Sequence, residues 1–179
     1  LDDAAGECFD KIAGLLGLAY PGGPELDRWS VKGNPAAYEF PRPLLNDATD
    51  NFSFSGLKTS VRYFLEKNPE LKEDNDQLPD LCASAQAAIV EVLVKKTLRA
   101  AAREGVGCVT ASGGVTCNRV LRVELAEACE KQGVSLRLAT PELCTDNAAM
   151  IGILAEQKLK SGNKPSAIEA DIKPGWVLA

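Results

Sequence analysis

Two glycines between a buried strand and an amphipathic helix constrain this chain more than any other feature. Residues 105–111 are apolar, rich in β-formers and bounded by glycines, which predicts a short buried strand. After Gly113 and Gly114, apolar residues recur at helical spacing as far as Cys129. A helix that starts directly after such a turn has unpaired backbone N–H groups at its positive end. These donors favour phosphate or polar nucleotide groups.

The glycines alone do not identify a ligand. The sequence Ser112-Gly113-Gly114 is not GxGxxG, and it lacks the Lys-Ser/Thr pair of a P-loop. An ordinary tight turn is therefore the default interpretation of this motif taken by itself. In the same way, Asn118 could simply cap the helix that follows.

Length and composition predict one soluble domain or one lobe of a larger protein. The chain has 179 residues, of which 45% are hydrophobic and 25% charged, which is ordinary for a globular chain. No run approaches the roughly 20 apolar residues of a membrane helix, and no basic segment leads into an apolar stretch at the N-terminus. We expect a cytoplasmic protein without a membrane partner.

The net charge of −5 argues against nucleic-acid binding over the whole surface. A nucleic-acid partner would need a local basic face. Lys95, Lys96, Arg99 and Arg103 fall close together on one predicted helix, but a solvated helix face is the default interpretation of this group.

The six cysteines show no CxxC pair and no regular spacing, and most lie among alanines and valines. We expect reduced thiols that pack in the interior, without disulfides and without a cysteine-bound zinc.

Hydrophobic periodicity predicts the order of the elements. Helices are expected over residues 2–18, 25–31, 55–68, 81–103, 119–132 and 144–159, and strands over 105–111 and 134–138. The expected caps are Asp2 or Asp3, Ser55 and Asp80. The segment Ala148–Ala155 is nearly all apolar, which predicts that the last helix is buried.

The strand–helix–strand–helix order with short links predicts a parallel pair of strands with a right-handed crossover. Ligands of open parallel sheets bind beyond the carboxyl ends of the strands, where both the glycine turn and Asp146 are expected. Along the chain we expect a helical segment with ordered loops (2–68), a linker (69–80), a helix–strand core (81–160) and a tail (161–179).

Five separated blocks resemble one known family in the same order. They are residues 2–11 (DDAAGECFDK), 20–24 (YPGGP), 51–59 (NFSFSGLKT), 112–119 (SGGV followed by NR) and 141–150 (PELCTDNAAM). Together they resemble the C-terminal part of the TsaD/Kae/Gcp family, which catalyses threonylcarbamoyl transfer to tRNA. The resemblance implies a helix-rich α/β fold: a partial ASKHA (actin-like ATPase/sugar kinase) lobe with a short parallel sheet and inserted helices. It also implies a single incomplete C-terminal lobe, because the family's first lobe and its histidine motif have no counterpart here.

The resemblance also assigns ligand contacts. The nucleotide-binding positions that it implies are Asp10, Gly23, Asp27, Gly113, Gly114 and Asn118. Asp10 would accept hydrogen bonds from ribose hydroxyls. The Asn118 amide would contact the adenylate beside the backbone N–H groups of the two glycines, since an amide offers both a donor and an acceptor.

By the same resemblance, Asp146 is a carboxylate ligand of one divalent metal, with iron (Fe²⁺) favoured over zinc. The implied partner ligands are two histidines four residues apart, and this chain contains no histidine. One carboxylate cannot hold such a metal alone. Without the resemblance, Asp146 is only an acidic group near a helix N-terminus.

The implied reaction moves a threonylcarbamoyl group from threonylcarbamoyl-AMP to N6 of the adenosine 3′ to the tRNA anticodon. Implied partners are tRNA, TsaB- and TsaE-like proteins and the missing N-terminal lobe. No catalytic residue is expected here, because imidazole activation of a nucleophile needs histidine, and the isolated lobe should be inactive. Two alternatives stay open: a non-catalytic ASKHA-type scaffold or interaction lobe, and a sugar- or acetate-kinase-like lobe, which the PELCTD block does not fit.

Overall fold

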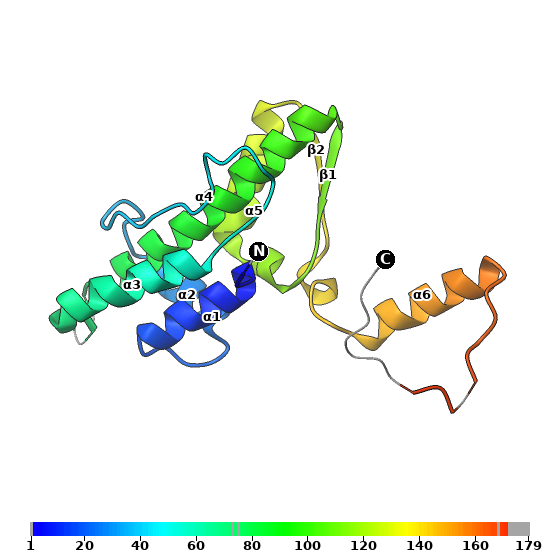
Figure 1. Cartoon of the computed structure of the whole chain (residues 1–179), viewed down its shortest axis with the longest axis horizontal. Helices are drawn as coiled ribbons and strands as arrows, with labels where there is room; N and C mark the ends of the chain where they lie inside the picture. The colour runs from blue at the N-terminus through cyan, green and yellow to red at the C-terminus, as the bar shows by residue number, and fades with distance from the viewer. Residues whose placement is uncertain (1, 73, 75, 168, 172–179) are drawn as a thin grey trace. The chain divides into compact units, whose positions relative to one another are not determined.

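The computed structural model describes residues 2–72, 74, 76–167 and 169–171. The chain divides into two compact units, Leu1–Thr145 and Asp146–Ala179. Figure 1 labels the α-helices and the two strands, and η denotes a 3₁₀ helix in the text. The elements are α1 (Ala5–Leu15), α2 (Gly22–Ser30), α3 (Ser55–Lys67), η1 (Pro69–Lys72), α4 (Leu78–Glu104), β1 (Cys108–Ala111), η2 (Gly114–Cys117), α5 (Arg119–Lys131), β2 (Ser135–Leu138), η3 (Pro141–Leu143) and α6 (Ala148–Lys160).

The long helix α4 organises the first unit. It begins with Pro79 in its first turn, where the missing N–H costs nothing, and it ends at Gly105 in the left-handed conformation (φ 64°). Its N-terminal half shares a hydrophobic core with α1, α2 and α3. Its C-terminal half packs in a second core with β1 and α5, and Figure 1 shows these two groups along the helix. The predicted stop at Gly105 is confirmed.

The irregular segment between α2 and α3 lies along α4 and is bonded to it by side chains. Lys96 donates from Nζ to the carbonyls of Leu44 (2.8 Å) and Thr49 (2.9 Å), and Arg99 donates to the carbonyls of Leu45 and Thr49. The Lys96 side chain is 1% exposed. The expectation that this basic group is a solvated helix face is therefore wrong for Lys96, because its ammonium replaces water with backbone carbonyls of a segment far away in the sequence.

The two strands form the predicted parallel pair. Cys108 pairs with Ser135 and Ala111 with Leu138, and Val109 is buried in the second core. The first strand is shorter than predicted. Gly105 belongs to the end of α4, so the chain becomes extended only after Gly107. No helix within the described residues is both long and apolar enough to cross a membrane.

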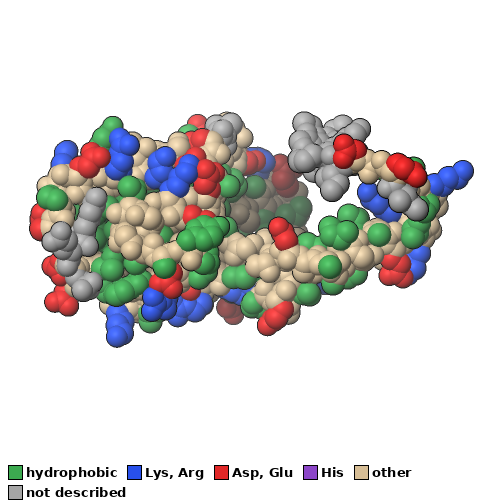
Figure 2. All heavy atoms as spheres, turned by 90° about the horizontal axis from the view of Figure 1, so that it is seen from below, with side chains coloured by type: hydrophobic (Ala, Val, Ile, Leu, Met, Phe, Trp, Pro, Cys, Tyr) green, Lys and Arg blue, Asp and Glu red, His purple; other side chains and the backbone are tan. Residues whose placement is uncertain are grey.

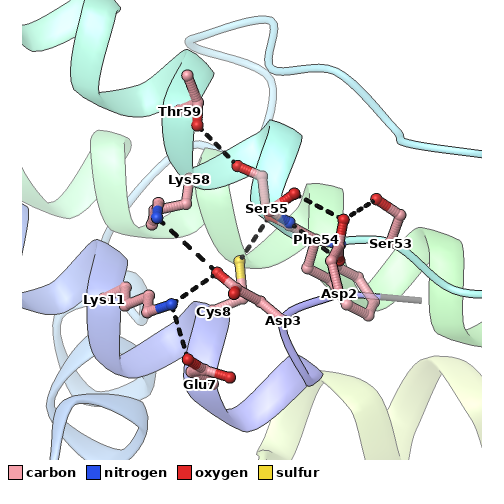
Figure 3. A network of polar contacts seen from close by, with 10 residues as sticks. All are labelled: Asp2, Asp3, Glu7, Cys8, Lys11, Ser53, Phe54, Ser55, Lys58 and Thr59. Atoms are coloured by element: carbon pink, nitrogen blue, oxygen red, sulfur yellow. Dashed lines mark hydrogen bonds and ion pairs between the residues drawn. The ribbon is translucent and has the colours of Figure 1, made fainter.

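Asp2 caps α3 and not α1, which corrects the predicted cap. Its Oδ1 accepts the backbone N–H of Phe54 (2.8 Å) and Ser55 (3.3 Å), and its Oδ2 accepts the hydroxyls of Ser53 and Ser55 (both 2.6 Å), as Figure 3 shows. These bonds hold the pKa of Asp2 far below its ordinary value, and the Ser53 hydroxyl has the largest effect. The neighbouring Asp3 instead pairs with Lys11 (2.9 Å).

Asp80 does not cap α4 as expected, because the helix already begins at Leu78 and Asp80 lies within its first turn. There its carboxylate accepts the backbone N–H of Asn34 (2.7 Å). The effect is again to tie the segment before α3 to α4.

The second unit, of which residues 146–167 and 169–171 are described, holds α6 followed by irregular chain as far as residue 171. No residue of α6 is buried, and Ile151 and Ile153 are 65% and 60% exposed. Figure 2 shows hydrophobic side chains open at the surface. The predicted burial is wrong because an apolar helix is buried only where another surface covers it, and the described part of this unit offers no second helix or sheet. Residues 172–179 of the predicted tail lie outside the described residues.

Candidate functional site

The glycine turn follows β1 directly and is built on Gly113. This residue has φ 95° and ψ 163°, a backbone conformation open essentially only to glycine. The Gly113 carbonyl accepts both the N–H (3.0 Å) and the hydroxyl (2.7 Å) of Thr116. Across the described residues, no hydrogen bond uses the N–H of Gly113 or Gly114. The turn therefore presents two free backbone donors at the carboxyl end of the strand.

These donors are not at the N-terminus of α5, although the sequence predicted that this helix starts directly after the glycine turn. The chain first makes the 3₁₀ turn η2, and α5 begins only at Arg119. The turn lies against α1 instead, because a methyl group added at Gly6 would be 3.3 Å from Val115 Cγ2.

Asp10 and Gly23 lie together at the N-terminus of α2. Asp10 Oδ1 accepts the backbone N–H of Gly22 (2.9 Å) and of Gly23 (3.1 Å), which satisfies two of the unpaired donors at that helix end. The approach is so close that a Cβ at Gly22 would lie 2.8 Å from the Asp10 Cα. Within the described residues these hydrogen bonds fall on Oδ1, which leaves Oδ2 open for a ligand.

Asp27 and Arg119 form the second pair of the site. Arg119 donates from Nε to Asp27 Oδ2 (2.8 Å) and from Nη2 to the Asp27 carbonyl (2.7 Å). The Asp27 side chain is 14% exposed, and in the part of the chain that is described its Oδ1 is buried without a hydrogen-bond partner. An unpaired buried carboxylate oxygen is costly, so this atom is ready to accept a donor from a ligand.

Asn118 has the capping role that its position suggested. Its Oδ1 accepts the N–H of Leu121 (2.9 Å), and its Nδ2 donates to Gln86 Oε1 (2.7 Å). Gln86 Nε2 in turn donates to Ser30 Oγ (2.8 Å), whose hydroxyl donates to the Asp27 carbonyl (2.8 Å). A continuous series of hydrogen bonds therefore joins α5, α4 and α2.

An open groove of about 420 Å³ lies beside this series. Three of its polar lining residues are Ser30, Gln86 and Arg119, and small or apolar residues form much of the rest, including Val31, Pro35 and Ala87. An apolar cleft with a few convergent polar groups is typical of a small-molecule site.

Two thiols lie next to the turn. Cys144 is buried and its Sγ is 3.1 Å from Thr116 Oγ1, whereas Cys117 is exposed and its Sγ donates to the Pro141 carbonyl (3.8 Å). Elsewhere, burial raises the pKa of Cys8 and of Cys82 to about 12. Four of the six cysteines are buried free thiols, while Cys117 and the strand residue Cys108 are exposed.

Asp146 begins the second unit and precedes its helix. The cap of α6 is Asn147, whose Oδ1 accepts the N–H of Met150 (3.0 Å), so Asp146 is not in the first helical turn as expected. Its side chain is exposed. No three His, Cys, Asp or Glu side chains gather anywhere in the described part of the chain as they would around a metal ion.

The structure thus brings together Asp10 with Gly23, and Asp27 with Asn118 through other side chains. Sequence reasoning missed the connecting residues Gln86 and Ser30 and the pairing of Arg119. Gln86 carried a signal, since it interrupts a run of small and apolar residues on α4.

The fold and these residues define a helix-rich α/β lobe with a glycine turn at the end of a short parallel sheet. Residues 1–153 match the family model of TsaD, tRNA N6-adenosine threonylcarbamoyltransferase. The chain therefore belongs to the TsaD family.

Proteins that carry the name tRNA N6-adenosine threonylcarbamoyltransferase match nearly the whole chain. The Geobacter metallireducens protein is 54% identical over 177 residues and the Geotalea uraniireducens protein 51% over 178 residues. The Paracidovorax citrulli protein is 48% identical over 184 residues. Each match covers 99% of this chain and 51% of the relative, so the chain spans about half the length of these relatives.

Proposed function

We propose that residues 1–179 form the adenylate-binding part of a tRNA threonylcarbamoyltransferase, built as a partial ASKHA lobe. The whole protein would transfer the threonylcarbamoyl group from threonylcarbamoyl-AMP to N6 of the adenosine 3′ to the anticodon. The observation that carries this proposal is the family match over residues 1–153, which contains every nucleotide-binding position that the sequence suggested.

The contacts of the site support an adenylate as ligand. The free N–H groups of Gly113 and Gly114 suit the phosphate. In the described residues Asp27 Oδ1 is buried without a partner, and the hydrogen bonds of the Asp10 carboxylate fall on Oδ1 and leave Oδ2 open. Both open oxygens suit the hydroxyl donors of a ribose. The groove beside Arg119 has room and apolar walls for a base. Asp10, Gly23 and Asn118 also make hydrogen bonds within the chain that fix the binding surface. The Asn118 amide would in addition contact the adenylate.

The transfer step needs little from this chain beyond binding. The N6 amine attacks the carbamoyl carbon and a C–N bond forms. The bond from that carbon to the phosphate oxygen breaks, AMP leaves with the electron pair, and the attacking nitrogen releases one proton to water. Negative charge therefore grows on the phosphate, where backbone donors of a preorganised turn stabilise it. We therefore propose that Gly113 and Gly114 act at the leaving group.

Asp146 is the proposed metal ligand of this chain. Asp146 would supply one carboxylate ligand to an iron ion, or to zinc. Because no three suitable side chains gather in the described part of the chain, the residues present do not fit a complete site. Other ligands would have to come from outside residues 1–179.

The tRNA, the TsaB- and TsaE-like proteins and an N-terminal lobe are proposed partners. Lys96 and Arg99 bond to carbonyls of the segment before α3, and Arg103 pairs with Asp50. The basic group on α4 is therefore largely used within the unit. We place the main tRNA contacts on the lobe and partners that complete the enzyme.

The test uses the protein that contains this chain together with the half of the family's length that the chain does not span. With threonylcarbamoyl-AMP and tRNA, mass spectrometry of the nucleosides should detect N6-threonylcarbamoyladenosine. Asp146→Ala should lower the rate by about a hundredfold. Gly113→Ala should raise KM for threonylcarbamoyl-AMP by about tenfold or more, because φ 95° excludes alanine.

Gly133→Ala is the matched control, since Gly133 also has a positive φ (66°), no atom near its missing side chain and no place in the site. It should leave KM unchanged. A complete protein that binds its partners yet transfers nothing would favour the non-catalytic scaffold instead.

A further inference from the structure

The hydrogen bonds between Asn118 and Asp27 have only one possible direction. At one end, the backbone N–H of Leu121 can only donate, so the atom that accepts it is Asn118 Oδ1. The Asn118 Nδ2 therefore faces Gln86 and donates to its Oε1. The backbone at each end thus fixes the orientation of every amide between.

At the other end, the Asp27 carbonyl can only accept. It receives the Ser30 hydroxyl (2.8 Å) and Arg119 Nη2 (2.7 Å). Because the Ser30 hydroxyl donates its hydrogen to this carbonyl, its Oγ acts as the acceptor for Gln86 Nε2. Gln86 is therefore the residue where the two halves meet, and its amide supplies both the acceptor and the donor that this position needs.

Gln86 and its two hydrogen-bond partners are all buried. Gln86 is 2% exposed on α4, Ser30 is 7% exposed on α2, and Asn118 is 8% exposed at the start of α5. A buried amide needs hydrogen-bond partners, because an unpaired one costs free energy and a hydrogen bond in the interior is strong. The same buried contact orients side chains on both sides of the groove.

We propose that Gln86 is a positioning residue for nucleotide binding, which holds Asn118 on one side and the Ser30–Asp27 segment on the other. The proposal rests on the proposed function, in which Asn118 and Asp27 contact the adenylate. Without Gln86, the Asn118 Nδ2 loses its acceptor and Ser30 loses its donor. The two ligand-binding groups can then move independently, and a ligand has to pay for ordering them.

The effect should fall on nucleotide binding and spare the later step. In the complete protein, Gln86→Met keeps the side-chain length but removes both bonds. It should raise the Kd for AMP and KM for threonylcarbamoyl-AMP by about tenfold, with kcat and KM for tRNA nearly unchanged. Gln86→Glu can still accept from Asn118 and should retain more of the affinity than Gln86→Met.

Ser84→Ala is the matched control. Ser84 lies two residues away on α4, is equally buried, and also joins distant segments, since its hydroxyl accepts from the Tyr38 N–H (3.1 Å) and donates to the Asn34 carbonyl (3.2 Å). It touches none of the proposed ligand-binding residues. Its substitution should lower the melting temperature without changing the Kd for AMP, and this separates loss of stability from loss of positioning.

A double-mutant cycle measures whether Gln86 acts through Asn118. Asn118→Ser retains a side chain that can cap α5 but has no amide to reach Gln86. If Gln86 works through that amide, adding Gln86→Met to Asn118→Ser should change the Kd for AMP by less than about twofold. A full tenfold loss on top of Asn118→Ser would overturn the proposal.

Asp27→Ala separates failure of the proposal from failure of the site. If Asp27→Ala and Asn118→Ser both weaken AMP binding while Gln86→Met binds like the unchanged protein, the site stands and the role of Gln86 is refuted. If neither of the two former changes affects AMP binding, the adenylate site is not here and both proposals fall.

Discussion

The helices α4 and α6 are both rich in apolar residues, yet their surroundings are opposite. In α4 most residues on the inner faces are buried, and even Lys96 is only 1% exposed. In α6 no residue is buried, and its isoleucines are more than half exposed. Apolar composition therefore indicates that a helix needs another surface to cover it. Whether that surface lies in the same stretch of chain is decided by residues elsewhere.

The largest effect is expected where the segment after α2 meets α4. A Cβ at Gly33 would lie 2.0 Å from the Pro79 carbonyl oxygen, so Gly33→Ala must move backbone of one or the other. We expect the free energy of unfolding to fall by about 3 kcal/mol or more. Urea denaturation followed by circular dichroism measures this.

The same substitution on α6 is the control. At Gly152, within α6, no atom lies within 4 Å of the missing side chain. Gly152→Ala should leave the free energy of unfolding unchanged or raise it by up to about 1 kcal/mol, because alanine favours the helix. Equal losses at both glycines would show that the two helices do not differ as described.

A smaller loss is expected at Lys96. Lys96→Met fits the buried stem of the side chain but leaves the carbonyls of Leu44 and Thr49 without their donor. We expect a loss of about 2 kcal/mol. The neighbouring Lys95 is 60% exposed and its ion pair within the described residues is with Glu91, so Lys95→Met should change stability by less than about 0.5 kcal/mol. Similar values for the two lysines would contradict the contacts between α4 and this segment.

The difference between these two lysines also shows where sequence reasoning ends. The parallel strands, the stop at Gly105 and the turn at Gly113 follow from local propensity and glycine geometry, and all three are confirmed. Lys95 and Lys96 look alike in the sequence. The carbonyls that bury Lys96 come from residues about fifty positions earlier, and no local pattern reports such a partner.

The candidate site divides in the same way. The family resemblance alone predicted Asp10, Gly23 and Asn118 as binding positions. The position of Asn118 before a helix also indicated that it could cap that helix. That Asp10 bonds to Gly23, and that Asn118 reaches Asp27 through Gln86, depends on how α1, α2, α4 and α5 pack. Local sequence patterns do not predict how such distant segments pack against one another.

Asp2 should contribute about 1 kcal/mol through the cap of α3. Its pKa is lower in the folded chain than in the unfolded chain, so the stabilisation is present above the ordinary pKa of aspartate and is lost as the pH falls below it. Asp2→Ala should therefore differ from the unchanged chain at pH 7, and the difference should shrink toward pH 3. Melting curves across this range measure it, with the exposed Glu130→Gln on α5 as control; a difference that grows on acidification would rule out the cap.

The smallest effect on stability is expected on α6. Burying an isoleucine stabilises a fold by about 1.5–3 kcal/mol, so a helix that is truly uncovered loses almost nothing when that side chain becomes polar. Replacing Ile151 and Ile153 by glutamine should change the free energy of unfolding of residues 1–179 by less than about 0.5 kcal/mol. The same replacement should reduce self-association, because exposed apolar side chains promote contacts between copies. Sedimentation velocity over a range of concentrations separates the two effects. A loss of more than about 1 kcal/mol with unchanged association would mean that α6 is covered within a single chain, and its contrast with α4 would disappear.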